Sequence, residues 1–279
     1  MSSDWSSDVC SSDLRVPYVV IGQGPVKAVL IPGAGDGLAT VDKAAKALER
    51  MYGYRSGECT TCIVSRRIPL LSEARGAPVP AAEAIRVYAG DFIGLLDELG
   101  WDEIVLECNS AGGPIGQVMA AGYPERIRGL VLASTLHRTN PSTSAVVGKW
   151  LEMIEHGDWK GFLWDTMAKT YTRKLRLYRL MKPFLGLMKP KNPHRIRALL
   201  GELEDLDNTD ILSGIKCPVL ITAGRVDEVC PPDIQHEMDR LIPDSRLILE
   251  PGYTHGNDVE NPEYRRLFLD FVKSYNSNR

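Results

Sequence analysis

The chain has 279 residues, of which 44% are hydrophobic and 25% are charged, and its formal net charge is -3. This composition is that of an ordinary soluble globular chain, which excludes intrinsic disorder and collagen-like or coiled-coil repeats. The negative charge argues against a nucleic-acid partner. No apolar run approaches the roughly 18 residues of a membrane span, so no transmembrane segment is expected.

The first fourteen residues contain Ser-Ser-Asp three times and almost nothing apolar. We therefore expect residues 1–14 to be a non-native or disordered tail and exclude them from the fold. A natural disordered tail is the alternative interpretation. The expected location is cytoplasmic, and a signal peptide stays open because the native start would then be missing.

Beyond this tail, short apolar runs alternate with segments of helical spacing. Such alternation predicts an α/β fold in which a mostly parallel sheet is covered by helices on both faces. Right-handed crossovers make it a doubly wound sheet. The expected strands are 17–21, 28–31, 62–65, 104–108, 127–133, 218–223 and 247–249. The expected helices are 41–51, 82–99, 111–123, 233–242 and 262–275.

The interval 137–212 interrupts this alternation, because it has helical spacing with proline and glycine breaks and contains no strand pattern. A helical insert between two sheet strands is expected to form a cap, or lid, over the carboxyl edge of the sheet. The core of the fold would then be residues 15–136 and 213–279.

The expected cap is aromatic and basic. Its aromatic side chains either line a pocket, with Trp150 and Trp164 as the chosen pocket residues, or form a small core of the cap itself. Residues 136–200 contain 13 Lys or Arg and 4 Asp or Glu. This charge either attracts anionic substrates or lies on a solvated helix face.

Six cysteines are too few for a disulfide scaffold in a chain of this length. Cys59 and Cys62 form a CxxC pattern, but no second pair follows it. The pattern leads into a strand, where residues three apart face opposite sides. We therefore expect free thiols and not a metal or redox site, and we expect Cys108 and Cys217 to be small buried hydrophobes.

A nucleophilic serine is predicted where the strand 104–108 runs into Asn-Ser-Ala-Gly-Gly at 109–113 and then a helix. This is the shape of a nucleophile elbow, usually G-x-S-x-G, whose sharp turn exposes the hydroxyl of Ser110. Gly112 gives the small residue that the turn needs, and Cys108 replaces the usual glycine. Taken alone, the pattern also fits a serine that caps the helix.

Two further side chains follow strand ends later in the chain. Asp227 lies just beyond the strand 218–223, and His255 lies just beyond the strand 247–249. The carboxyl edge of a parallel sheet is where ligands bind. His255 is suited to take the proton of Ser110 near neutral pH, and Asp227 to hold the histidine tautomer and stabilise the imidazolium.

Acyl transfer also needs two preorganised N–H donors for the oxyanion. One is expected from the amide of Ala111, at the positive end of its helix. The other is expected from the loop Pro-Gly-Ala-Gly-Asp-Gly at 32–37, where we choose the amide of Ala34.

These motifs together resemble those of serine hydrolases of the α/β-hydrolase fold superfamily, over about residues 15 to 279. The run Pro-Glu-Arg-Ile-Arg-Gly-Leu-Val-Leu at 124–132 also matches the family's sequence after the elbow helix. The resemblance implies the α/β-hydrolase fold with a helical cap between two core strands. The chain departs from the family at Pro32, where histidine is common, and at Cys108.

No cofactor and no metal are expected. No histidine pair has metal-ligand spacing, the glycines of 33–37 do not have the spacing of a dinucleotide fingerprint, and no P-loop is present. His137 follows a strand end and is a possible pocket residue. Glu107 lies on a strand expected to be buried, so we expect it to pair with an arginine or lysine. A carboxylate tuned by desolvation near the nucleophile is the alternative.

The leading hypothesis is hydrolysis of an ester-like acyl bond of a small, largely apolar substrate through an acyl-enzyme on Ser110. Carboxylesterases, lactonases and thioesterases share this machinery. A serine at the elbow argues against dehalogenase and epoxide-hydrolase chemistry, which use a carboxylate there. The alternatives are an acyltransferase or lyase with the same triad, or a non-catalytic ligand receptor. A homo-oligomer is left open.

Overall fold

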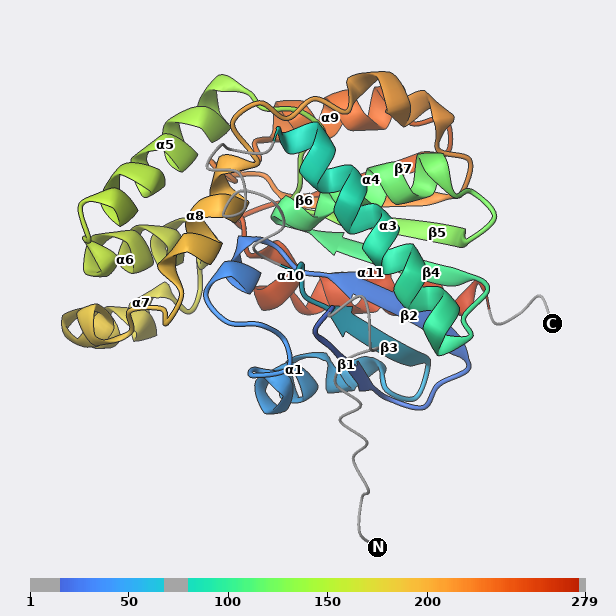
Figure 1. The fold of residues 1–279 in the computed structure, drawn as a ribbon, viewed down its shortest axis with the longest axis horizontal. Helices are drawn as coiled ribbons and strands as arrows, with labels where there is room; N and C mark the ends of the chain where they lie inside the picture. The colour runs from blue at the N-terminus through green and yellow to red at the C-terminus, as the bar shows by residue number, and fades with distance from the viewer. Residues whose placement is uncertain (1–15, 68–79, 276–279) are drawn as a thin grey trace, which may run out of the picture.

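The computed structural model describes residues 16–67 and 80–275, and the prediction for residues 1–14 lies outside them. A seven-stranded sheet in the order β1-β3-β2-β4-β5-β6-β7 forms the centre of the molecule (Figure 1). The strands are β1 (Tyr18–Ile21), β2 (Val26–Ile31), β3 (Cys59–Val64), β4 (Ile104–Asn109), β5 (Ile127–Ala133), β6 (Val219–Gly224) and β7 (Ser245–Glu250).

The sheet is parallel except at one edge. β1 runs antiparallel to β3, while every other neighbouring pair is parallel. Every residue of β4 and of β6 is buried, as expected for strands that are covered on both faces. The predicted doubly wound, mostly parallel α/β sheet is confirmed.

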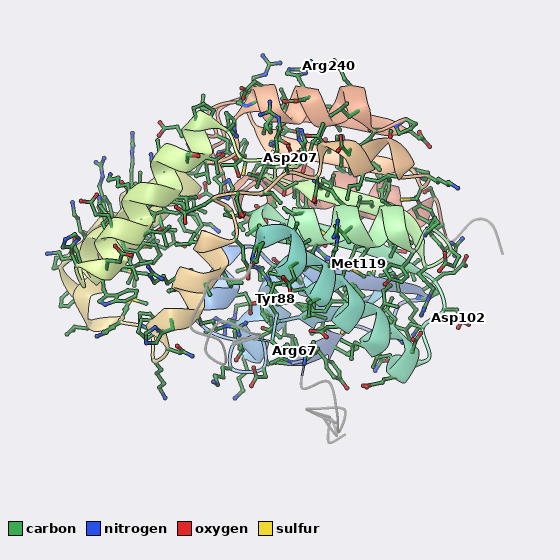
Figure 2. All side chains as sticks on the ribbon, turned by 45° about the horizontal axis from the view of Figure 1, so that its top comes forward. Arg67, Tyr88, Asp102, Met119, Asp207 and Arg240 are labelled. Carbon is green, nitrogen blue, oxygen red and sulfur yellow. The ribbon has the colours of Figure 1, made fainter. Side chains whose placement is uncertain are left out.

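Helices pack on both faces of the sheet. Apolar residues of α3, α4 and α9 join one core cluster with alternate sheet residues, and those of α11 join a second cluster on the opposite face. Figure 2 shows Tyr88 on α3 and Met119 on α4, two of the side chains in the first cluster. Outside the interval 137–212, the α-helices of the described residues are α1 (Ala45–Tyr52), α3 (Ala81–Leu99), α4 (Gly113–Gly122), α9 (Pro232–Leu241), α10 (Asn257–Glu260) and α11 (Pro262–Lys273).

Two predicted elements differ by three or more residues at their starts. The helix predicted from residue 41 begins at Ala45, because the amide of Val41 donates to Ser65 Oγ at 2.9 Å and the chain turns there. The strand predicted from residue 62 begins at Cys59.

Cys59 and Cys62 are free thiols and belong to core clusters on opposite faces. Burial raises the pKa of Cys59 to about 12.

The interval between β5 and β6 is helical. Asn140 begins α5, since its side chain accepts from the amides of Ser142 and Thr143. Trp150 packs edge-on against Phe162, with ring centres 6.2 Å apart. We propose that this interval is a cap. Its elements are α5 (Pro141–Glu155), α6 (Trp159–Thr170), α7 (Leu175–Tyr178), η4 (Arg179–Leu187), α8 (Pro193–Gly201) and η5 (Thr209–Gly214).

Glu107 lies inside the sheet in a closed polar cluster. Its carboxylate pairs with the guanidinium of Arg55, and the two side chains are only 1% and 0% exposed. The hydroxyl of Tyr264 donates to Glu107 Oε1 at 2.6 Å. The guanidinium of Arg55 also stacks on the ring of Phe268, 3.9 Å from its centre. The prediction that Glu107 pairs with a basic residue is confirmed, and both oxygens of its carboxylate have partners in Arg55 and Tyr264.

Candidate active site

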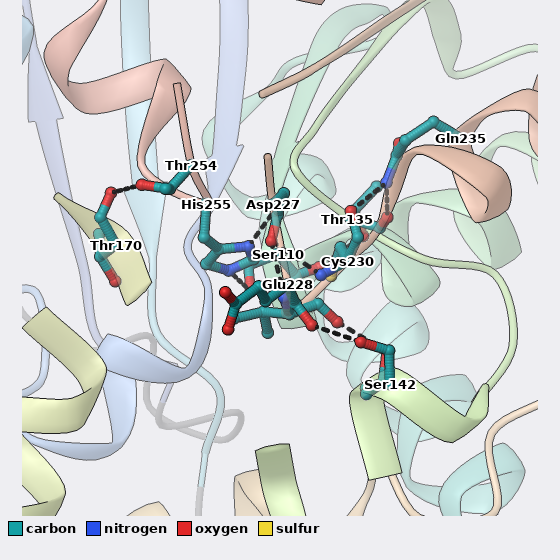
Figure 3. Close-up of polar contacts among 12 residues, drawn as sticks. Ser110, Thr135, Ser142, Thr170, Asp227, Glu228, Cys230, Gln235, Thr254 and His255 are labelled. Atoms are coloured by element: carbon teal, nitrogen blue, oxygen red, sulfur yellow. Dashed lines mark hydrogen bonds and ion pairs between the residues drawn. The ribbon is translucent and has the colours of Figure 1, made fainter. Parts of the chain in front are cut away.

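Three loops at the carboxyl edge of the sheet bring Ser110, Asp227 and His255 together (Figure 3). Ser110 follows β4, Asp227 follows β6 and His255 follows β7. His255 Nε2 lies 2.8 Å from Ser110 Oγ, and His255 Nδ1 lies 2.9 Å from Asp227 Oδ2. A hydroxyl, an imidazole and a carboxylate in this order form the arrangement that activates a serine for attack on an acyl carbon.

The turn after β4 holds Ser110 in a strained backbone conformation. Its φ is 50°, in the left-handed region that non-glycine residues rarely adopt. The turn is tight, because a Cβ added to Gly112 would collide with the carbonyl oxygen of Ile31. Thr135 fixes the turn from the other side by donating its hydroxyl to the carbonyl oxygen of Ser110. Strand and helix therefore approach closely and present the Ser110 hydroxyl to His255.

Cys108, which departs from the expected glycine, is accommodated by a glycine one turn into α4. A Cβ added to Gly116 would collide with the sulfur of Cys108. Cys108 is fully buried, so its side chain fills the space that Gly116 leaves. β4 and α4 can therefore approach closely, because the small residue is Gly116 of the helix and not residue 108 of the strand.

Backbone amides of its own loop hold the carboxylate of Asp227 in place. Asp227 Oδ1 accepts from the amides of Val229 and Cys230 at 2.8 and 2.9 Å, which leaves Oδ2 for His255. Burial by itself lowers the pKa of His255. The charge of Asp227, with hydrogen bonds to Asp227 and Cys230, outweighs burial and raises this pKa well above the ordinary histidine value.

The loop after β2 lies directly against the nucleophile. A Cβ added to Gly33 would lie 2.8 Å from Ser110 Cβ and 3.4 Å from Ser110 Oγ. Ala34 follows at the start of a short 3-10 helix, and Ala111 follows Ser110 in another. The role of the Ala34 and Ala111 amides as oxyanion donors stays a prediction, which this packing supports.

A charged cluster that sequence reasoning missed fixes the same loop. Asp36 is buried, and its Oδ2 accepts from the amide of Arg66 at 3.0 Å and from the guanidinium of Arg195 at 2.8 Å. The Arg66 guanidinium donates to the carbonyl oxygens of Pro32 and Gly33. Arg195 belongs to α8, so the cap interval helps to hold the loop expected to bind the oxyanion.

A second carboxylate near His255 was also missed. Asn109 donates its side-chain amide to Asp258 Oδ2 at 2.8 Å. Burial raises the pKa of Asp258 to about 7, opposed by the charge of His255. No sequence motif predicted a role for Asp258, because its contact with Asn109 depends on how α10 packs against the end of β4.

The helical interval is bonded to both the acid loop and the base loop (Figure 3). Ser142 donates its hydroxyl to the carbonyl oxygen of Glu228 at 2.8 Å. Residues 169–174, here called the strap, join α6 to α7. The amide of His255 donates to the carbonyl of Lys169 at 3.2 Å, and that of Gly256 to the carbonyl of Thr170 at 2.8 Å.

Glu260 binds the far end of the strap. Its carboxylate accepts from three consecutive amides, those of Thr172, Arg173 and Lys174, at 2.7, 3.2 and 2.8 Å. Glu260 belongs to α10, the helix that follows His255. The strap is therefore fastened at both ends to the segment that carries the histidine.

The predicted pocket residues are not brought into the hydrogen-bonded relay. The ring of His137 is fully buried with Nε2 3.7 Å from Glu237 Oε1, and burial lowers its pKa. Trp150 donates its indole N–H to Asp165 Oδ2 at 2.8 Å, and Trp164 lies under the ammonium of Lys182. Their role as pocket residues stays a prediction.

Within residues 16–67 and 80–275, no group of three or more His, Cys, Asp or Glu side chains is arranged to hold a metal ion.

Comparison with known proteins gives a family and several relatives. The family model described as alpha/beta hydrolase fold matches residues 29–262. The pimeloyl-[acyl-carrier protein] methyl ester esterase of Neisseria meningitidis is 26% identical, over 70% of this chain and 76% of its own.

Solved structures agree in fold. A thermophilic esterase from Thermogutta terrifontis aligns with a TM-score of 0.68 and 25% identity, covering 92% of this chain and 93% of its own. The enol-lactonase from Burkholderia xenovorans LB400 aligns with a TM-score of 0.72 and 17% identity, covering 94% and 96%.

The exchange of small residues between β4 and α4 predicts compensation. Gly116→Ala should lower the free energy of unfolding by about 1–3 kcal/mol through overpacking, and Cys108→Ala by about 1 kcal/mol through a small void. The double variant should be more stable than the sum of the two losses predicts, because the void accepts the new methyl group. Urea unfolding of the four proteins measures this, and strict additivity would contradict it.

Asp227→Asn should leave the fold intact and reduce turnover of an activated ester by about 10⁴-fold. The asparagine carbonyl can still accept from Val229 and Cys230, but its amide would donate to His255 Nδ1 and favour the wrong tautomer. Asp258→Asn is the matched control and should lose far less. Near-normal activity in Asp227→Asn, with activity lost in Asp258→Asn, would assign the acid's role to Asp258.

The raised pKa of His255 fixes the sign of the pH dependence. A protonated imidazole cannot accept the serine proton, so kcat/KM should fall as the pH drops through this pKa. The midpoint of the acid limb should lie above about 6.5, the value of an unperturbed histidine. An NMR titration of the His255 ring in Ser110→Ala should give a raised pKa as well. A midpoint at or below the ordinary value would be inconsistent with the Asp227–His255 pairing.

Proposed function

The chain belongs to the alpha/beta hydrolase family, and on that premise we propose that it is a serine hydrolase. Its reaction is cleavage of the ester-like acyl bond of a small, largely apolar substrate. The observation that carries the proposal is the continuous relay from Asp227 through His255 to Ser110. Relatives named as a methyl ester esterase, an esterase and an enol-lactonase support the same bond type.

The first half of the reaction forms the acyl-enzyme. Ser110 Oγ attacks the acyl carbon while His255 Nε2 takes the hydroxyl proton. The carbonyl oxygen becomes an oxyanion, for which we assign the amides of Ala34 and Ala111 as donors. The tetrahedral intermediate collapses as His255 returns the proton to the leaving oxygen, and the alcohol departs.

The second half repeats these steps with water. His255 removes a proton from a water molecule, which attacks the acyl carbon of the ester on Ser110. Collapse of the second intermediate returns the proton to Ser110 Oγ and releases the acid. Asp227 acts throughout by holding Nδ1–H of His255 and by stabilising the imidazolium that forms in each half.

A cytoplasmic location is kept as part of the proposal. The cysteines of the described residues are free thiols, which supports a reducing compartment. Burial also raises the pKa of Cys59, Cys62 and Cys108, so none of these three is a competing nucleophile.

Labelling with a fluorophosphonate tests the proposal without knowledge of the substrate. We expect one adduct per chain on Ser110, located by peptide mapping, because only an activated serine reacts. Ser110→Ala and His255→Ala should both abolish the adduct while circular dichroism shows a folded chain. A folded wild-type chain without adduct would argue against an assembled triad and in favour of a non-catalytic receptor.

A screen of esters, lactones and thioesters follows from a positive label. Product analysis with a competing alcohol distinguishes transfer to water from transfer to the alcohol. Release of free acid as the main product would support hydrolysis, and dominant transfer to the alcohol would make the enzyme an acyltransferase.

A further inference from the structure

The cap carries a surface segment of unusual composition, residues 173–191, here called the basic-apolar segment. Its sequence is Arg-Lys-Leu-Arg-Leu-Tyr-Arg-Leu-Met-Lys-Pro-Phe-Leu-Gly-Leu-Met-Lys-Pro-Lys. It contains no Ser, Thr, Asn, Gln, His, Asp or Glu. Its helical part, α7 and η4, lies at the tip of the cap, far from the sheet (Figure 1).

Apolar side chains of this segment face outward. Nine large hydrophobic side chains are exposed in the described part of the chain, and six of them lie here. Leu185 is the one residue of α7 and η4 that is buried. The six exposed side chains are Leu177 (64%), Leu180 (73%), Met181 (43%), Phe184 (62%), Leu187 (84%) and Met188 (56%).

Their positions follow the spacing of a 3-10 helix. Met181, Phe184 and Leu187 of η4 are three residues apart, which places them on one side of a helix with three residues per turn. A stripe of this kind normally faces a protein core. Here its side chains are exposed, and a group of neighbouring exposed apolar side chains marks an interaction site.

Positive charge surrounds the stripe. Residues 166–201 contain ten Lys or Arg and no Asp or Glu, and three of the ten pair with carboxylates outside this range. Arg176, Arg179, Lys189 and Lys191 are exposed. Within the described ranges, none of these four forms an ion pair. The surface therefore presents exposed apolar side chains next to exposed cations.

We propose that the basic-apolar segment docks the cap onto the surface of an anionic lipid bilayer. Leu, Met and Phe side chains would enter the boundary between headgroups and acyl chains, while the Lys and Arg side chains pair with lipid phosphates. A protein interface typically has a polar rim, whereas the only neutral polar side chain of this segment is that of Tyr178.

The docking is peripheral and does not span the bilayer. None of the helices formed by residues 16–67 and 80–275 has both the length and the apolarity that crossing a bilayer requires. The strap is hydrogen-bonded to the His255 loop and continues into α7, so one stretch of chain contacts the proposed catalytic site and leads to the docked surface. Lipid binding itself needs no catalysis and stands independently of the proposed function.

Vesicle flotation with the full chain tests this inference. We expect binding to vesicles of phosphatidylcholine with phosphatidylglycerol and little binding to phosphatidylcholine alone. Added salt should weaken the binding, because exposed cations are screened. Absence of binding to the anionic vesicles would overturn the proposal, and so would equal binding to both vesicle types.

Two variants separate the contributions of charge and of apolar side chains. Arg176→Gln, Arg179→Gln and Lys189→Gln together should lower partitioning to anionic vesicles by about 100-fold. Leu180→Ser, Phe184→Ser and Leu187→Ser together should lower it by at least about tenfold. These side chains are exposed, so the fold should be unaffected.

The matched control replaces exposed apolar residues elsewhere, with Val20→Ser and Met51→Ser, and should leave vesicle binding unchanged. Hydrolysis of a short p-nitrophenyl ester should be the same in all of these proteins, which separates docking from catalysis. Wild-type binding by the apolar variant would overturn the proposal. A wild-type dimer in sedimentation that the apolar variant lacks, without vesicle binding by either, would reassign the surface to a second copy of the chain.

Discussion

The 2.9 Å contact between Asp227 and His255 is the interaction on which the site depends, and the sheet is what makes it possible. β6 and β7 are parallel neighbours, so the loops that follow them leave the sheet side by side. The loops also bond directly, since the amide of Val226 donates to the carbonyl of Tyr253 at 3.1 Å. A Cβ on Gly224 would collide with the same carbonyl, so the acid and base loops meet at a position where only glycine fits.

The helical interval between β5 and β6 completes this arrangement from outside. It bonds the acid loop through Ser142 and the base loop through the strap, and Arg195 of α8 reaches Asp36 in the loop beside Ser110. The loops after β2, β6 and β7 therefore each have a partner in the inserted helices. The geometry of the relay depends on the core and on the inserted helices together.

The sequence predicted what depends on local pattern. Each of Ser110, Asp227 and His255 follows an apolar run that forms a strand of the sheet, buried in β4 and β6 and half-buried in most of β7, so their order and edge of the sheet could be inferred. The partners of buried charges could not. Glu107 was expected to need a cation, but Arg55 is 52 residues away, and Arg195 is 159 residues from Asp36. Such pairs form where elements distant in the sequence pack together, so residue spacing along the chain does not predict them.

The pairing of Cys108 with Gly116 also limits the order in which the two positions change during evolution. A chain with cysteine at 108 and any side chain at 116 has a clash between strand and helix, whereas a chain with glycine at both has only a void. A stepwise exchange of the small residue between the two positions is therefore less costly through the intermediate with glycine at both. A larger side chain at 116 is accepted more readily once the side chain at 108 has become small.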